Sequence, residues 1–89
     1  MIEIECIIDA VAKQYYIKGT GIHHREDGPA AEYNFSGNKY WMQQGEYHRL
    51  DGPAVERNDG TKSWWYYGKF IPVDNQKDFE RYIKMIGFE

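Results

Sequence analysis

Short runs of aromatic and β-branched residues, separated by glycine-containing turns, occupy most of the chain between residues 15 and 73. Residues 40–43 and 63–67 are such runs, and aromatic side chains favour strands. The dipeptide at Asp59 and Gly60 is a strong tight-turn signal, and Gly45 and Gly68 mark two further turns. The pattern predicts an antiparallel meander with short strands at residues 15–18, 22–25, 30–35, 39–43, 46–50, 54–57, 62–67 and 69–72.

The first residues of the chain alternate between apolar and acidic side chains. Apolar residues at positions 2, 4 and 6 are separated by Glu3 and Glu5, which is the period of a strand with one buried face. We therefore expect a half-buried strand over residues 2–8, with Cys6 as a small buried side chain within it.

The end of the chain has a helical period. Apolar residues at positions 79, 82, 83 and 86 follow the i, i+3, i+4, i+7 spacing of one helix face. This spacing predicts a helix over residues 75–87, capped by Asp74 or Asn75 and ended by Gly87. We expect the helix to cover one sheet face or to dock on a neighbouring chain. Residues 1–89 thus form a single domain of mainly β (α+β) class, a repeat-built antiparallel β-meander with one C-terminal α-helix.

A seven-residue motif occurs twice in the meander. Residues 24–30 read His-Arg-Glu-Asp-Gly-Pro-Ala, and residues 48–54 read His-Arg-Leu-Asp-Gly-Pro-Ala, 24 positions later. Further on, Gly37 and Trp41 match Gly60 and Trp64 at a distance of 23, so one residue is missing from the second copy near the turn at 35–37. Diverged partial copies precede and follow, as is common for terminal repeats that act as caps. Residues 15–73 therefore read as two full hairpin units between two partial ones.

The Asp-Gly-Pro triplets predict a second kind of turn. Glycine relieves the crowding that a following proline imposes, and aspartate accepts hydrogen bonds from the amides of its own turn. Proline cannot donate a hydrogen bond to a neighbouring strand, so it lies outside a strand or at its start. The predicted structural turn residues are Asp27, Gly28, Pro29, Asp51, Gly52 and Pro53.

The two His-Arg pairs allow three interpretations. In the first, Arg25 and Arg49 pair with Asp27, Asp51 or the nearby glutamates, while each histidine caps a turn. In the second, the Arg–His pairs bind phosphate groups, because a guanidinium group binds phosphate bidentately. A metal site would use His23, His24 and His48 with the motif aspartates, but no established ligand spacing is present. We expect no metal and no cofactor.

Consecutive aromatic residues in the strands at 39–43 and 62–67 place large rings on both faces of the sheet. One face can form the core. The other must be covered by the helix, a second subunit or a ligand. Tyr and Trp dominate the energetics of protein interfaces and also stack on nucleobases, so this face is a candidate binding surface.

Composition argues against several classes of protein. The net charge of −3 disfavours a duplex nucleic-acid binder with a basic face. One cysteine permits neither an intramolecular disulfide framework nor a Cys-based zinc cage. No apolar run approaches the roughly 20 residues that cross a bilayer, and the first residues are acidic where a signal peptide is basic. Catalytic motifs are absent, so we expect a non-enzymatic protein of the cytoplasm.

The doubled motif resembles the DGPA-type (HRxDGPA) repeats of proteins encoded by tailed phages and large DNA viruses. It is also distantly similar to MORN-like repeats, which are β-hairpin units. The resemblance covers residues 15–73; residues 1–14 and the third unit, which lacks the His-Arg and Asp-Gly-Pro groups, depart from it. The resemblance implies the hairpin architecture and a small viral protein that acts on a host component in the host cytoplasm.

Two functional hypotheses follow. In the first, a homo-oligomer sequesters a phosphorylated small ligand, such as a cyclic nucleotide signal, as a counter-defence protein. In the second, the aromatic face docks on a host protein and inhibits it. Neither hypothesis involves catalysis, duplex nucleic acid or a membrane. The predicted ligand-binding residues are His24, Arg25, His48, Arg49, Trp41, Trp64, Trp65 and Tyr66.

Overall fold

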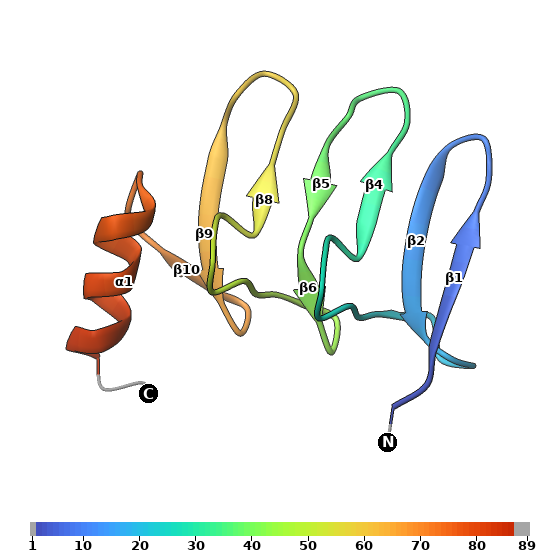
Figure 1. Ribbon diagram of the computed structural model, residues 1–89, viewed down its shortest axis with the longest axis horizontal. Helices are drawn as coiled ribbons and strands as arrows, with labels where there is room; N and C mark the ends of the chain where they lie inside the picture. Colours follow the sequence, from blue (N-terminus) through green and yellow to red (C-terminus); the bar gives the residue numbers. More distant parts are fainter. Residues whose placement is uncertain (1, 87–89) are drawn as a thin grey trace.

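The computed structural model describes residues 2–86 as an antiparallel sheet with one helix at its end (Figure 1). Seven strands follow one another in the order β1-β2-β4-β5-β8-β9-β10, β3 pairs with β2, and β6 pairs with β7. The mainly β fold with one C-terminal helix, predicted from the sequence, is confirmed. The elements are β1 (Ile4–Ile8), β2 (Ala12–Ile17), β3 (Ile22–His23), β4 (Ala31–Tyr33), β5 (Lys39–Tyr40), β6 (Met42–Gln43), β7 (Glu46–Tyr47), β8 (Val55–Glu56), β9 (Lys62–Tyr66), β10 (Lys69–Ile71) and α1 (Gln76–Met85).

Long hairpins β1–β2, β4–β5 and β8–β9 stand side by side, and the short hairpins β2–β3, β6–β7 and β9–β10 turn at the opposite end of the molecule (Figure 1). Gln44 and Gly45 have φ angles of 53° and 78°, and Tyr67 and Gly68 have 45° and 81°. Positive φ at both central residues is the turn geometry that matches strand twist. The predicted repeat of paired hairpins is thus present.

The one-residue deletion in the second copy falls in the turn of a long hairpin, as predicted. The Tyr33 amide donates to the Asn38 carbonyl across the turn between β4 and β5, and the Arg57 amide donates to the Thr61 carbonyl in the next unit. The second of these turns is one residue shorter. The strands between residues 22 and 57 are shorter than predicted, because the chain bends at each His-Arg and Asp-Gly-Pro segment, where proline cannot pair. By contrast, the strand predicted at residues 15–18 is longer and begins at Ala12.

The strand register divides the side chains between two faces. Tyr40 pairs with both Ala31 and Val55, and directly paired residues share a face while neighbours along a strand alternate. One face therefore carries Trp64 and is covered by α1; we call it the helix face. The opposite face, which we call the ladder face, carries the side chains of Tyr33, Tyr40, Tyr47, Trp65 and Phe70.

The hydrophobic core is small and lies beneath the helix. Trp64, Ile71 and Phe79 are only 4%, 0% and 1% exposed and form its centre. The molecule measures 39 × 35 × 17 Å, so away from the helix the sheet is a single layer in which small side chains are buried. Partly buried residues around the centre are Tyr66, Val73, Tyr82 and Ile83.

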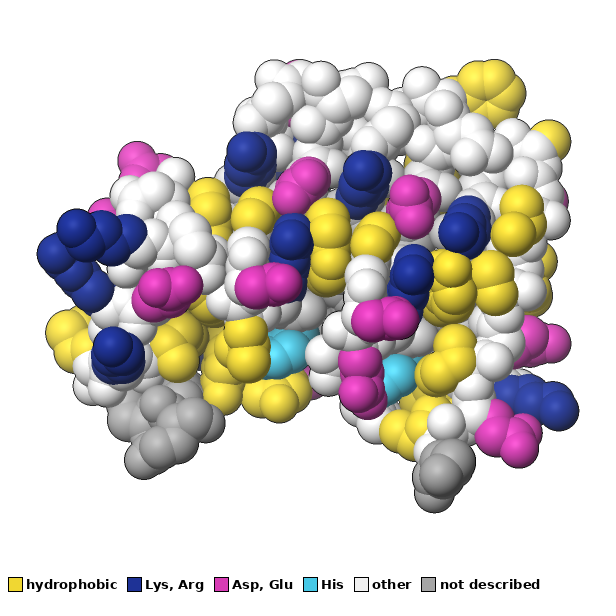
Figure 2. Space-filling view, viewed as in Figure 1, with side chains coloured by type: hydrophobic (Ala, Val, Ile, Leu, Met, Phe, Trp, Pro, Cys, Tyr) yellow, Lys and Arg dark blue, Asp and Glu magenta, His cyan; other side chains and the backbone are white. Residues whose placement is uncertain are grey.

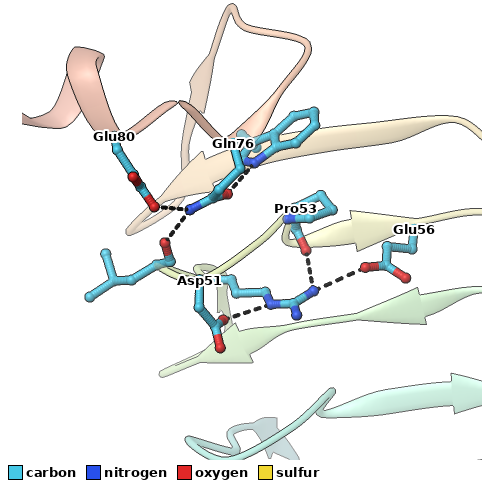
Figure 3. Close-up of polar contacts among 8 residues, drawn as sticks. Asp51, Pro53, Glu56, Gln76 and Glu80 are labelled. Carbon is cyan, nitrogen blue, oxygen red and sulfur yellow. Dashed lines mark hydrogen bonds and ion pairs between the residues drawn. The ribbon is translucent and has the colours of Figure 1, made fainter. Parts of the chain in front are cut away.

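The helix is attached to the sheet of its own chain. The Asn75 side chain accepts a hydrogen bond of 2.9 Å from the Asp78 amide at its N-terminus. Gln76 accepts a hydrogen bond from the Trp64 indole at 2.8 Å and donates one to the Leu50 carbonyl at 2.8 Å (Figure 3). Of the predicted span 75–87, residues 76–85 are helical, and the predicted stop at Gly87 lies outside the described residues.

The prediction of a half-buried first strand with a buried Cys6 is wrong. Every residue of β1 is exposed, Cys6 included. The alternation of apolar and acidic residues normally marks a strand with one face against a core. Here β1 is the end strand of a single-layer sheet, and α1 covers only the opposite end (Figure 1). Within the part of the chain that the structure describes, the apolar side chains of β1 therefore have no second layer to pack against.

Candidate functional site

Arg49 lies flat over the indole ring of Trp41 on the helix face. Its Cζ atom is 3.8 Å from the ring centroid, within the range of a cation–π interaction. The Arg49 Nε donates to Asp51 Oδ1 at 2.9 Å, and Nη1 donates to the Pro53 carbonyl at 3.1 Å and to Glu56 Oε2 at 3.0 Å (Figure 3). We call this arrangement of ring, guanidinium and turn the second clamp.

The first copy of the motif builds the same arrangement, which we call the first clamp. The Arg25 Cζ atom is 4.0 Å from the ring centroid of Tyr15. Its Nε donates to Asp27 Oδ1 at 2.9 Å, its Nη1 donates to the Pro29 carbonyl at 3.3 Å, and Glu32 lies at 4.0 Å. The interpretation in which each arginine pairs with carboxylates of its own repeat is confirmed.

The guanidinium groups explain the glycine of each motif. Neither Gly28 nor Gly52 has a positive φ, so the backbone conformation itself admits other residues. A Cβ atom on Gly52 would lie 2.6 Å from Arg49 Cζ, and one on Gly28 would lie 2.7 Å from Arg25 Cζ. These distances are too short for carbon atoms that are not bonded. Each guanidinium therefore needs a residue without a side chain on the turn beneath it.

The motif histidines join each unit to the following hairpin. His24 Nδ1 accepts a hydrogen bond of 2.9 Å from the Gln44 amide, and His48 Nδ1 accepts one of 3.0 Å from the Tyr67 amide. Both imidazoles are buried. An Nδ1 that accepts from an amide belongs to the neutral ring with its proton on Nε2. The prediction that each histidine caps a turn is confirmed, and the capped turn belongs to the next repeat.

Burial lowers the pKa of His48 below its usual 6.5, and the negative charge of Glu46 opposes this shift. In the first motif, Glu26 lies 3.3 Å from His24 Nε2, whereas Leu50 takes its place in the second motif. A second proton on His48 would have to occupy Nδ1, where the Tyr67 amide already donates. Protonation therefore opposes the folded arrangement around His48.

We expect the free energy of unfolding to fall as the pH is lowered through and below 6.5. The unfolded chain binds the proton at a higher pH than folded His48 does, so acid favours unfolding in this window, and stability is regained above it. His23, whose pKa burial also lowers, adds an effect of the same sign. Urea titrations between pH 5 and pH 8 measure the dependence.

The matched variant for this titration is His48→Asn, whose amide oxygen can accept from the Tyr67 amide without titrating. Its stability should fall less over the same pH range than that of the unmodified chain. A pH dependence of equal size in both proteins would contradict the assignment to His48.

A cavity of about 430 Å³ opens between the two clamps. From the predicted binding set it is lined by Arg25, Trp41, His48 and Arg49. Carboxylates of Glu26, Asp27 and Asp51 line it as well, so the charge there is mixed. The hydrogen bond from Arg49 keeps the pKa of Asp51 below its usual value, and Arg25 does the same for Asp27. Both guanidinium groups are therefore already neutralised by ionised partners.

The remaining predicted binding residues lie elsewhere. Trp64 is buried beneath the helix, and Trp65 is on the ladder face. Tyr66 packs beside the core centre and edge-on to His48, at 5.0 Å. His24 lines a separate hollow next to β1. The structure thus brings four of the eight predicted residues together and separates the rest.

Aromatic rings cross the ladder face in one continuous row. Tyr33 meets Tyr40 edge-on with centroids 5.8 Å apart, and Tyr40 stacks on Tyr47 at 5.9 Å. Tyr47 meets Trp65 at 5.0 Å, and Trp65 meets Phe70 at 5.4 Å. The rings are half-buried, and Phe70 is 52% exposed. Of this row, the predicted ligand-binding residues include only Trp65, although the aromatic surface predicted for residues 39–43 and 62–67 also contains Tyr40. The register that aligns rings from β4 to β10 is not visible in the sequence.

A hollow of about 350 Å³ lies beside this row, lined by Tyr33, Tyr40, Tyr47, Met42 and Arg57 together with His23 and Ala31. Arg25 and Arg49 each have a carboxylate at 2.9 Å. Among residues 2–86, the exposed Arg57 side chain has no such partner. The hollow therefore combines apolar walls with the guanidinium group of Arg57, whose positive charge also interacts with the nearby Asp59 carboxylate.

The helix face carries a row of alternating charges (Figure 2). Register places Lys13 opposite Glu32, Glu32 opposite Lys39, and Lys39 opposite Glu56. Lys62 continues the row from Glu56. Opposite charges that face each other across strands stabilise a sheet by about 0.2–1 kcal/mol per pair. The helix face therefore carries this charged row in addition to the core residues beneath α1, whereas the ladder face carries the row of aromatic rings.

Within residues 2–86, no group of three or more His, Cys, Asp or Glu side chains is placed to hold a metal ion. The described part of the chain contains no helix of the length and apolar character that would cross a membrane.

No family model, curated protein or solved structure matches the chain. The resemblance to viral DGPA-type repeats therefore stays a prediction.

Proposed function

We propose that the protein is a non-catalytic binding module whose ladder face docks a segment of another protein. The observation that carries this proposal is the continuous row of half-exposed rings, from Tyr33 to Phe70, on a face that none of the described residues covers with a second layer. Aromatic side chains of this kind supply most of the binding energy at protein interfaces. Each ring of the row also contacts its neighbours.

The hollow beside the row indicates the chemistry of the docked segment. Tyr33, Tyr40 and Met42 offer contacts to an apolar side chain, and Arg57 offers a charge-assisted hydrogen bond to a carboxylate. A segment with an acidic residue next to an apolar one fits this combination. The resemblance to repeats of phage and viral proteins supports a further part of the proposal, in which the partner is a host protein that the module inhibits as a counter-defence function.

Selection of a random peptide display library on the immobilised protein tests the docking proposal. We expect enriched peptides to carry an acidic residue beside an apolar one. Their affinity, measured by fluorescence polarisation, should fall at least about tenfold in Trp65→Ala and in Arg57→Ala, as for interface residues that dominate binding. Arg81→Ala, an exposed arginine of α1, is the matched control and should bind normally.

Two results would overturn the docking proposal. One is the enrichment of basic or purely polar peptides. The other is equal affinity of the selected peptides for the unmodified protein and for both ladder-face variants.

The cavity between the clamps favours a second candidate function, sequestration of a phosphorylated small ligand such as a cyclic nucleotide. Its volume of about 430 Å³ lies in the range of small-molecule sites, and Trp41 and two guanidinium groups line it. The three carboxylates weigh against an anionic ligand, so we rank this function second. A cyclic nucleotide that raises the melting temperature of the unmodified protein, but not of Arg49→Ala, would support it.

A further inference from the structure

The two ends of the repeat array differ in how the edge strand of the sheet is covered. At the β10 end, α1 covers the core, and Pro72 follows the strand, which blunts that edge because proline has no amide hydrogen to donate. At the β1 end, the described residues provide no helix and no further strand. Stacked repeat proteins require a polar cap at each end, yet this end presents exposed isoleucines at positions 2, 4, 7 and 8.

Hydrogen bonds at the two ends of β1 show which of its backbone groups are free. The Lys18 amide donates to the Glu3 carbonyl at 2.9 Å, and the Asp9 amide donates to the Ala12 carbonyl at 3.0 Å. Bonded and non-bonded pairs alternate along an antiparallel ladder, so the odd-numbered residues of β1 direct their backbone groups toward β2. The N–H and C=O groups of Ile4, Cys6 and Ile8 therefore point outward at the open edge.

We propose that β1 pairs with β1 of a second copy of this chain, antiparallel and about a two-fold axis at Cys6. This register places Ile4 opposite the partner's Ile8 and Cys6 opposite the partner's Cys6. All five residues of the strand are then paired, and the outward backbone groups meet their own counterparts. On the helix-face side of the pair, apolar residues face apolar residues.

The alternative registers are less favourable. A shift by two residues in one direction places Glu5 opposite the partner's Glu5, and like charges that face each other across strands are destabilising. A shift in the other direction leaves Ile4 without a partner inside the strand. Self-complementarity of the full strand therefore selects a second copy as the occupant of this edge.

The dimer extends the proposed function without depending on it. A two-fold axis perpendicular to a continuous sheet keeps equivalent faces on the same side, so both rows of aromatic rings lie on one surface. Two docking sites on one particle raise the apparent affinity for a partner that itself has two sites. A five-residue strand pair is a small interface, so we expect self-association with a Kd of roughly micromolar order.

Mass measured by light scattering over a concentration series tests the dimer. We expect the mass to rise from the 10.6 kDa of one chain to twice that value. In Ile8→Glu the new carboxylate faces Lys13 within the chain, so β1 keeps its pairing to β2 while a charge enters the interface. This variant should stay monomeric. Phe35→Glu, an 89% exposed apolar residue at the turn between β4 and β5, is the matched control and should remain dimeric.

Cys6, the single cysteine of the chain, reports the register. A short bis-maleimide, which adds to one thiol at each end, should link two unmodified chains efficiently and two Ile8→Glu chains poorly. A monomer at all concentrations, an open series of larger species, or linking that Ile8→Glu leaves unchanged would each overturn the proposal. Peptide binding by the ladder face is measured separately, so failure of the dimer and failure of the docking function are distinguishable.

Discussion

Replacement of Phe79 by alanine should lower the free energy of unfolding by about 3–5 kcal/mol, as is usual for a fully buried phenylalanine. Phe79 is 1% exposed and joins α1 to Trp64 and Ile71 at the centre of the core. A domain of this size has a correspondingly small reserve of stability, so the loss is a large share of the total. Urea denaturation followed by circular dichroism and tryptophan fluorescence measures it.

The position of Phe79 explains why this single residue matters so much. Ile71 pairs with Trp64 in the third unit, at the position where His48 bonds to Trp41 in the second unit. In the second unit Arg49 follows His48 and covers the Trp41 ring, but in the third unit Pro72 follows Ile71, so no arginine covers the Trp64 ring. Met85→Ala, on the same helix but 75% exposed, is the control and should change stability by less than about 0.5 kcal/mol. Similar losses in both variants would contradict the assignment of Phe79 as the residue that closes the array.

The second large effect concerns the second clamp. Arg49→Ala should lower the free energy of unfolding by about 2 kcal/mol, since it removes charge-assisted hydrogen bonds and a cation–π contact. The Arg49 side chain is 19% exposed, so part of the full value for a buried group is lost to solvent. Gly52→Ala should have a similar cost, because its Cβ atom displaces the guanidinium from the Trp41 ring. Urea denaturation measures both variants.

A double-mutant cycle separates this mechanism from general damage to the turn. If Gly52→Ala acts by displacing Arg49, the double variant should be no less stable than Arg49→Ala alone, with a coupling energy of about 1–2 kcal/mol. Additive losses would show that the alanine strains the backbone itself. Arg81→Ala, whose side chain is 70% exposed, controls for the loss of a positive charge and should change stability by less than about 0.5 kcal/mol.

The local sequence was sufficient to predict the repeat, the hairpins and the helix. These features depend on residues that are only a few positions apart in the sequence. Examples are the turns at Gly45 and Gly68, the shorter second turn and the helical spacing after Asn75. The pairing of arginine with carboxylates was also open to prediction, because Arg49 and Asp51 are two residues apart. The aromatic ring beneath each arginine was not predicted, because Trp41 and Tyr15 lie outside the motif and contact it only in the folded chain.

Whether Cys6 and the predicted binding residues are exposed or buried depends on contacts between distant segments. Cys6 is exposed because residues 2–86 provide no second layer over the N-terminal end of the sheet. Trp64 and Trp65 look equivalent in the sequence, yet α1 buries one and leaves the other in the row of rings on the opposite face. The position of the helix decides between them.

The sequence alone determined the repeating unit, since its motif contains both the arginine of each clamp and the turn that holds it. Only the tertiary structure decided which surfaces remain available for binding. The physical reason is that hydrogen bonds and turns within a motif act over a few residues, whereas exposure depends on which strands become neighbours and where the single helix packs. The row from Tyr33 to Phe70 joins strands that are far apart in the sequence, and the open edge at β1 exists because the helix covers the other end.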